Sequence, residues 1–507
     1  MNTRTEHIPL MPDVGVIALV AEKWNASWRR RHHILSRLAR YFHVIWVSPG
    51  PEWRTILRST SQRGPNFTGS VVGPGFSVYT PDSFPPTIYR PRWLGSLAQR
   101  LRVSRAHRTL VHRGCKRIIL YVCRPEFGAA VASVPHDISC YHIDDEYSFS
   151  KVDAPLDPVE SQLLRAVDQV IVHSRGLLDK KGSLNPNVTL VPNGVDYAAY
   201  ARPQPQPQDL SPIPRPRIGY TGVLKTQLDW PLICYLILQH PEWSYVFVGP
   251  NAPHPDAIEM IGLLASRPNV YFLGAKSVEA LSSYPQHFDA CIMPYRLDGY
   301  TKYIYPLKLH EFLASGRPVV GTPIRSLQEF AHIVALAGTP VAWSIALTDA
   351  LSAAAIRPAR VDARRTVARQ HDWNTLVRQV ARILAERLGP TYLDRLDKAA
   401  PELDSSLPLN RLAAPQPPNV FSLPRLLETP GESNALEGTR TTKSQIRRTG
   451  SRRPGRARLK RLCCEDGISG RIFIFAIALF SRPKCSLGAG GHRDSDLCRV
   501  AESRGEV

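Results

Sequence analysis

A lysine and a glutamate three residues apart open a short helical pattern in the stretch YIYPLKLHEFLASGRPVVGTPI, residues 303–324. Pro306 suits the first turn of a helix, where its missing N–H costs nothing, and Gly316 suits the left-handed position at the helix end. Lys308 and Glu311 fall together on one face, away from the apolar stripe of the same helix. This spacing places two opposite charges at the start of a helix.

The types of these two residues fit a nucleoside diphosphate. At a helix N-terminus the free N–H groups and the helix dipole attract a diphosphate, and Lys308 adds a full positive charge. Glu311 can accept two hydrogen bonds, which suits the two neighbouring hydroxyls of a ribose. The alternative is a solvated ion pair between Lys308 and Glu311, worth about 0.2–0.5 kcal/mol. The spacing by itself does not decide between the two.

Three acidic residues follow a predicted strand in the segment YHIDDEYSF, residues 141–149. Asp144, Asp145 and Glu146 would repel one another, so one pKa should rise toward the range useful for proton transfer. Such a carboxylate could act as a general base. Alternatively, the acids cap a following helix, as Asp often does. His142, on the strand itself, is expected to pack in the core.

Buried strand patterns alternate with helical patterns along most of the chain, which predicts an α/β fold. The prediction is two Rossmann-like, doubly wound parallel-sheet domains that face each other across a cleft, where such sheets bind ligands. A proline-dense stretch separates the two runs, and the periodicity disappears near residue 393. The predicted parts are an N-terminal Rossmann-like domain (1–196), a proline-rich linker (197–215), a C-terminal Rossmann-like domain (216–392) and a disordered basic tail (393–507).

The chain of 507 residues carries a net charge of +21, which favours partners such as nucleic acid, anionic lipid or phosphorylated ligands. No signal-peptide pattern is evident, and the longest apolar run, residues 472–480, is shorter than a bilayer needs. Nine cysteines without metal or disulfide spacing favour a reducing cytosol. These features predict a cytoplasmic protein. An arginine-rich face at residues 28–42 predicts peripheral contact with the anionic inner face of the plasma membrane, or else a merely solvated surface.

Several ordered segments resemble the GT-B glycosyltransferases, of the family 4/1-like type. The nearest resemblance is to bacterial enzymes of teichuronic-acid biosynthesis and to glucuronosyltransferase-like enzymes. It extends over about residues 13–390, whereas the segment after residue 393 has no counterpart in the family. The matching segments are residues 24–49, 141–149, 170–200, 218–250, 269–296 and 293–324.

The resemblance implies that residues 1–196 form the acceptor domain and residues 216–392 the nucleotide-sugar-binding domain. It also implies roles for individual positions in the second of these domains. In the family, the glutamate matching Glu311 holds the nucleotide ribose and the lysine matching Lys308 approaches the diphosphate. Gly222 matches a glycine turn at the first strand of the nucleotide domain, where a side chain would obstruct the phosphates. Ser174 and residues 193–194 match positions at the edge of the cleft, with a helix cap and a turn as their expected roles.

The resemblance also implies a donor pocket and a catalytic base. Tyr295 and Arg296 match positions that line the donor pocket, although Arg296 could equally be an exposed loop residue. Tyr303 is also expected at the donor site. It stands where many relatives carry a second glutamate that touches the donor sugar, so their sugar and stereochemistry do not transfer to this chain. The acidic pair of the family makes Asp145 the first candidate for the base and Asp144 the second.

Together these observations predict a metal-independent, hexosyltransferase-type enzyme. It would move a sugar from a UDP-type donor to a hydroxyl of a saccharide or lipid-linked acceptor in cell-surface polysaccharide or glycolipid synthesis. No cofactor is expected beyond the nucleotide-sugar co-substrate, and no metal or nucleic-acid partner. Two alternatives remain: a GT-B epimerase or hydrolase that acts on the nucleotide sugar without an acceptor, and a non-catalytic nucleotide-binding protein.

Overall fold

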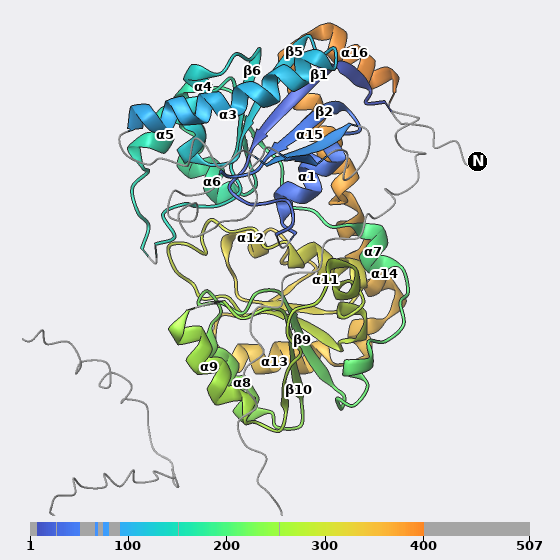
Figure 1. Cartoon of the computed structure of the whole chain (residues 1–507). Coiled ribbons are helices and arrows are strands. Elements are labelled where there is room, and N and C mark those ends of the chain that lie inside the picture. Colours follow the sequence, from blue (N-terminus) through green and yellow to red (C-terminus); the bar gives the residue numbers. More distant parts are fainter. Residues whose placement is uncertain are drawn as a thin grey trace, which may run out of the picture. The chain divides into compact units, whose positions relative to one another are not determined.

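The computed structural model describes residues 8–26, 28–50, 66–68, 75–80, 92–150, 152–252 and 254–399. All of them belong to one compact unit, Met1–Pro424. Their strands form two sheets, one of eight strands and one of six (Figure 1). The predicted α/β class with two parallel sheets is confirmed, and most of the predicted tail lies outside the described residues.

The first sheet has the strand order β3-β4-β2-β1-β5-β6-β7-β8. Its neighbouring strands run parallel, except that β3 and β4 are antiparallel. The strands β3 and β4 were not predicted from the sequence. The strand bounds are β1 Met11–Leu19, β2 Phe42–Val47, β3 Asn66–Thr68, β4 Phe76–Thr80, β5 Arg117–Val122, β6 Ile138–His142, β7 Gln169–Val172 and β8 Val188–Leu190.

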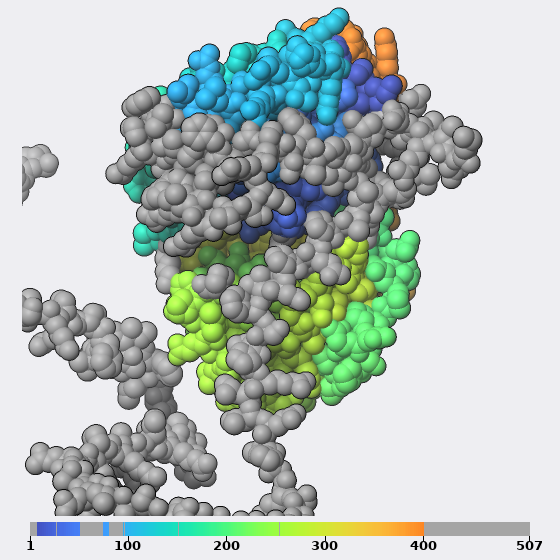
Figure 2. Space-filling model, in the orientation of Figure 1, coloured from blue at the N-terminus to red at the C-terminus, as the bar shows by residue number. Residues whose placement is uncertain are grey.

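Helices cover both faces of this sheet, which explains why β1 is an almost continuous apolar run rather than an alternating one. Helix α3 lies at the surface and is light blue in Figure 2. The helices of this part are α1 Arg30–Leu38, α3 Arg92–His112, α4 Gly128–Ser133, α5 Pro158–Ala166 and α6 Arg175–Lys181.

The second sheet is entirely parallel, with the order β11-β10-β9-β12-β13-β14. Its strands are β9 Arg217–Thr221, β10 Ser244–Val248, β11 Val270–Phe272, β12 Ala290–Met293, β13 Val319–Gly321 and β14 Ala335–Leu336. Its helices are α8 Trp230–Gln239, α9 Pro255–Ala265, α10 Val278–Leu281, α11 Lys308–Ser315, α12 Arg325–Gln328, α13 Pro340–Ala350 and α14 Pro358–Gln370.

The proline-dense stretch 197–215 is packed rather than a bare linker. It contains helix α7, Tyr197–Ala201, which contacts α11, and a single 3-10 turn, Gln208–Leu210. Leu210 and Ile213 are buried in the core of the second sheet. Prolines exclude a long regular element here, but they do not prevent apolar side chains between them from packing.

The last two described helices, α15 and α16, do not follow the predicted domain boundary at residue 392. Helix α15, Trp373–Leu388, packs against α1 and joins the hydrophobic core of the first sheet, although residues up to 392 were assigned to the second domain. Helix α16, Pro390–Lys398, extends the ordered chain beyond the predicted limit. The amphipathic face of α15 predicts a helix, but local periodicity cannot say which sheet that face covers.

The arginine-rich face of α1 is not a solvated surface. Arg30, Arg31 and Arg37 are buried: Arg30 donates to the carbonyl of Ile143 at 3.0 Å, Arg37 pairs with Asp196 at 3.2 Å, and Arg31 pairs with carboxylates described below. These three side chains are therefore not available to a membrane surface, and peripheral membrane contact stays a prediction. Among the described residues, no helix is both long and apolar enough to cross a membrane.

Candidate active site

Lys308 begins α11 at the carboxyl edge of the second sheet. Its Nζ donates to the Tyr295 hydroxyl at 3.0 Å and lies 4.7 Å from the centroid of the Tyr220 ring. Within the described part of the chain, Lys308 forms no ion pair with Glu311, so the alternative of a simple salt bridge is not realised. Burial alone would lower the pKa of Lys308, but the neighbouring Tyr220 and Tyr295 keep it above its ordinary value. The amine is therefore charged at neutral pH.

A second lysine, Lys225, approaches the same place from the loop between β9 and α8. Burial and the nearby charge of Lys308 lower the pKa of Lys225 to about 8. Among the residues that the structure describes, neither lysine has a carboxylate within ion-pairing distance. Sequence reasoning did not single out Lys225, although its position three residues after Gly222 was a usable signal. Two half-buried ammonium groups without a carboxylate counter-ion among the described residues indicate a site for an anionic ligand.

Gly222 forms the floor between β9 and Lys308. Its φ of +128° is one that residues with side chains rarely adopt, and an added Cβ would lie 3.1 Å from the Lys308 Nζ. Gly249, at the end of β10, packs so closely that its added Cβ would lie 2.1 Å from the Gly222 carbonyl oxygen. The two glycines keep backbone, rather than side chains, beside the lysine, as expected for a site that admits phosphates.

Glu311 lies one turn along α11 and is half-buried. Burial raises the pKa of Glu311 to about 7, while the charge of Lys308 and a hydrogen bond from the Tyr200 hydroxyl lower it. Tyr200 comes from α7, in the stretch that the sequence assigned to the linker. Because α7 packs on α11, the glutamate is held beside the lysine site instead of pointing into bulk solvent.

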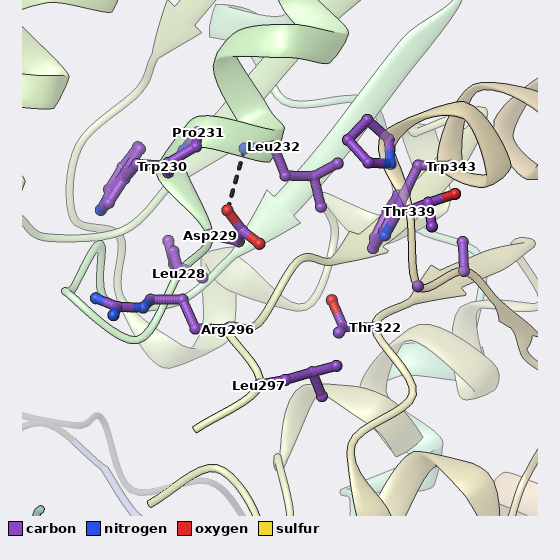
Figure 3. A pocket seen from close by; sticks show the side chains of 13 residues that line it. Leu228, Asp229, Trp230, Pro231, Leu232, Arg296, Leu297, Thr322, Thr339 and Trp343 are labelled. Atoms are coloured by element: carbon purple, nitrogen blue, oxygen red, sulfur yellow. Dashed lines mark hydrogen bonds between the residues drawn. The ribbon is translucent and has the colours of Figure 1, made fainter. Parts of the chain in front are cut away.

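The two predicted pocket residues after β12 lie in different surroundings. Tyr295 is 2% exposed and holds Lys308. Arg296 is half-buried and lines a cavity of about 670 Å³ beside the N-termini of α8 and α13 (Figure 3). Thus only Tyr295 contacts the lysine site, because consecutive residues at a strand end project in opposite directions.

Tyr303 does not project toward the lysine site. It is 4% exposed, its hydroxyl donates to the Asp153 carboxylate, and its backbone carbonyl accepts from the Ser174 hydroxyl at 2.7 Å. Ser174 also caps α6 by accepting from the Leu177 N–H, which confirms its predicted capping role. The expectation that Tyr303 binds the donor is not supported by this arrangement, in which it joins the two sheets.

The adjacent acids Asp144 and Asp145 have opposite environments. Although burial alone would raise the pKa of Asp144, its ion pair with Arg31 and a hydrogen bond from Tyr147 at 2.8 Å lower it. Arg31 also pairs with Glu22. Asp144 is therefore a fixed, ionised partner of Arg31 and is poorly suited to accept a proton.

Asp145 has the properties of a general base. Its Oδ1 accepts from the Tyr300 hydroxyl at 2.8 Å and from the Glu146 N–H at 2.9 Å. The pKa of Asp145 is raised to about 6, because burial and the charge of Asp144 raise it more than Tyr300 and Lys225 lower it. The Tyr300 hydrogen bond links this carboxylate, which follows β6 of the first sheet, to the loop before α11, and Lys225 is near enough to affect its pKa.

The remaining acidic and histidine residues of this segment are structural. Glu146 is buried and pairs with Lys181 at 3.1 Å. His142 is buried with its pKa lowered by burial and by Arg30, which confirms the expected core histidine. The helix-capping alternative is wrong, since the next helix, α5, is capped by Asp157. Among the described residues, no group of three His, Cys, Asp or Glu is placed to hold a metal ion.

Comparisons with known proteins agree with this architecture. Residues 215–353 match the family model of Glycosyl transferases group 1. A Bacillus subtilis (strain 168) protein with the provisional name teichuronic acid biosynthesis glycosyltransferase TuaH is 31% identical over 233 residues, which are 44% of this chain and 57% of that protein. The chain thus spans little more than half the length of the curated relative it matches.

Solved structures show the same fold at low sequence identity. Sucrose-phosphate synthase from Thermosynechococcus elongatus superposes with a TM-score of 0.59 at 16% identity, covering 74% of this chain and 98% of that one. A UDP-forming trehalose-phosphate synthase from Burkholderia xenovorans gives 0.54 at 13% identity, covering 76% and 99%. The predicted GT-B fold is confirmed, and with it the resemblance noted from the sequence.

Proposed function

From a GT-B fold with a Glycosyl transferases group 1 domain at residues 215–353, we propose that the chain transfers a sugar from a nucleoside-diphosphate donor to an acceptor hydroxyl. The observation that carries the proposal is the pair Lys225 and Lys308. Lys308 lies against Gly222, Lys225 is near enough to Lys308 for the charge of Lys308 to lower its pKa, and neither lysine has a carboxylate counter-ion among the described residues. A diphosphate would supply the charge that this pair lacks.

Each residue of the site then has a defined task. The two lysines balance the charge that develops on the diphosphate as its bond to the anomeric carbon breaks. Glu311 accepts hydrogen bonds from the ribose hydroxyls. Asp145 takes the proton of the acceptor hydroxyl while the oxygen bonds to the anomeric carbon, and its raised pKa strengthens it as a base. A base in this position corresponds to inversion at the anomeric carbon, so the stereochemistry of the product tests the assignment.

The finer identity of the substrates is also proposed. UDP is the first nucleotide to test because a structural neighbour is named UDP-forming, and cell-surface polysaccharide or glycolipid synthesis is suggested by the name of the Bacillus subtilis relative. We propose a hexosyl donor and a saccharide or lipid-linked acceptor, with a cytoplasmic location. Because two lysines are available to neutralise the leaving diphosphate, we expect transfer to continue in the presence of EDTA.

Thermal unfolding of the full chain with UDP or GDP tests the donor site. A nucleotide at 100 times its dissociation constant should stabilise the protein by about 2.7 kcal/mol. We expect a larger shift with UDP than with GDP, and little shift in Lys225→Met or Lys308→Met. Lys116→Met, which removes an exposed lysine remote from the site, is the matched control and should respond like the original chain. An undiminished UDP shift in both site variants would refute the proposal.

Turnover distinguishes this function from the two alternatives. A transferase should consume the donor slowly until an acceptor is supplied. Rapid release of free or epimerised sugar from the donor alone would instead identify a hydrolase or epimerase. Nucleotide binding that survives Asp145→Asn, without turnover of any donor by the original chain, would identify a non-catalytic binding protein.

A further inference from the structure

The cavity of about 670 Å³ is separate from the lysine site proposed for the donor. It lies beside α8 and α13 at the carboxyl edge of the second sheet, and residues that follow β9, β12, β13 and β14 line it (Figure 3). Lys225, Lys308 and Glu311 are not among its lining residues. The Asp229 N–H donates to the Pro294 carbonyl at 2.8 Å, and Leu228 pairs with Tyr295, so the β9–α8 loop is attached to the end of β12.

A buried hydroxyl without a partner faces this cavity. Thr322, directly after β13, is 5% exposed, and its Oγ1 has no hydrogen-bond partner among the described residues. Figure 3 shows this oxygen directed into the cavity. Leaving such a group unsatisfied costs about 1–3 kcal/mol, and a polar ligand in the cavity would remove that cost.

The charges around the cavity favour an anion. Arg296 lines it and forms no ion pair with any carboxylate of the described chain. The N-termini of α8 and α13, helices of 10 and 11 residues, both border it and contribute positive potential. The one lining acid, Asp229, has its Oδ1 engaged as the cap of α8, where it accepts from the Leu232 N–H at 3.1 Å.

The size of the cavity and its apolar walls indicate a ligand larger than a free inorganic ion. Ligand cavities usually have volumes of about 300–1,000 Å³, with a few polar groups set in apolar walls. Here Leu232, Pro231 and Leu297 supply apolar surface beside Arg296 and Thr322. We propose that this cavity is a second ligand site, which binds a sugar-sized molecule carrying one carboxylate or phosphate.

The second site would share a loop with the donor site. The indole N–H of Trp230, which lines the cavity, donates to the Lys225 carbonyl at 3.2 Å. An occupant that moves Trp230 therefore acts on the backbone of a donor-site lysine. Trp230 and Trp343 also provide a fluorescence signal, because both indoles border the cavity.

The test uses the full chain and three matched sugars: glucose, glucuronate and glucose 6-phosphate, with inorganic phosphate as a fourth probe. Binding is followed by tryptophan fluorescence and by calorimetry. We expect at least one charged sugar to bind at least 10-fold more tightly than glucose and than phosphate alone. Arg296→Gln should weaken that binding at least 10-fold and Thr322→Val at least 3-fold, whereas Arg360→Gln, which removes an exposed arginine of α14, should not change it.

Independent variants separate this inference from the proposed donor site. Lys308→Met should abolish the response to UDP and retain the response to the charged sugar. The inference is overturned if glucose binds as well as its charged analogues, if phosphate alone binds as tightly, or if Arg296→Gln has no effect. It is also overturned if UDP competes with the charged sugar, since the cavity would then be part of the donor site.

Discussion

The raised pKa of Glu311 predicts that Glu311→Gln makes the ligand-free protein more stable. The same substitution should weaken nucleotide binding, because hydrogen bonds to the carboxylate are lost. In the folded chain, burial raises the pKa of this carboxyl from an ordinary 4.5 to about 7. The folded state therefore holds an extra proton between about pH 4.5 and pH 7, and stability is lost as the pH rises through this interval. A glutamine has no charge to bury, so it avoids this loss.

The size of the stability change follows from the difference between the two pKa values of Glu311, in the folded and the unfolded chain. A displacement of 2.5 pKa units corresponds to about 3.4 kcal/mol at full burial, at 1.36 kcal/mol per unit. Glu311 is only half-buried, and solvent screens its charge, so we expect about 1–2 kcal/mol at pH 8. The carboxyl is mostly protonated at pH 5, where the glutamine variant should differ little from the original chain.

Melting temperatures at pH 5 and pH 8 measure this difference. In a domain of 150–250 residues, 1 kcal/mol corresponds to about 2–4 °C, so Glu311→Gln should melt several degrees higher at pH 8 only. Glu386→Gln, at an exposed position of α15, is the control and should shift little at either pH. The variant should bind UDP about 10-fold more weakly, as expected for about 1.4 kcal/mol of lost hydrogen bonding. Equal stabilisation at both pH values, or none at pH 8, would refute the burial argument.

Asp145→Asn should lower the transfer rate about 100- to 10,000-fold and leave UDP affinity within about 2-fold, measured by kinetics and calorimetry. In the original chain the rate should fall as the pH drops below about 6, because Asp145 then binds a proton. Tyr300→Phe removes a hydrogen bond that lowers this pKa, so the fall should begin at a higher pH; a shift to lower pH would contradict the assignment. Gly222→Ala should lose about 1–3 kcal/mol and UDP binding, because of its positive φ and its contact with Lys308. By contrast, Gly262→Ala, in helix α9 with open space where the added Cβ would lie, should gain about 0.5–1 kcal/mol; equal melting temperatures for the two variants would refute the strain argument.

Local patterns allowed much of the architecture to be predicted. Strands that are covered on both faces appear as short apolar runs, and this was enough to locate β1, β5 and β9 within a few residues. The short strands β3 and β14 were missed, because they contain only three and two residues and leave no periodic signal. The helix that carries Lys308 and Glu311 was found because its cap and apolar stripe lie within one segment.

Contacts between distant segments could not be predicted in the same way. Lys225 joins Lys308 because β9 and β12 are neighbours in the sheet, although the two lysines are 83 positions apart in the chain. Tyr303 donates to Asp153, which is 150 positions earlier in the chain, and spacing within one segment could not predict this contact. From the sequence alone, the arginines of α1 were compatible with a solvated face. Their partners Asp144, Asp196 and a backbone carbonyl come from distant segments, so only the tertiary structure shows these contacts.

The sequence by itself therefore determined the α/β class, the two parallel sheets and the residue types suited to a nucleoside diphosphate, since each depends on periodicity and spacing within about twenty residues. The tertiary structure decided which of those residues meet. It lowers the pKa of Asp144 and raises that of Asp145. It also places Tyr295 beside Lys308 and Arg296 in the neighbouring cavity, and it brings a second lysine, Lys225, to the site. The physical reason is that burial and charge depend on neighbours in space, which the order of residues along the chain does not specify.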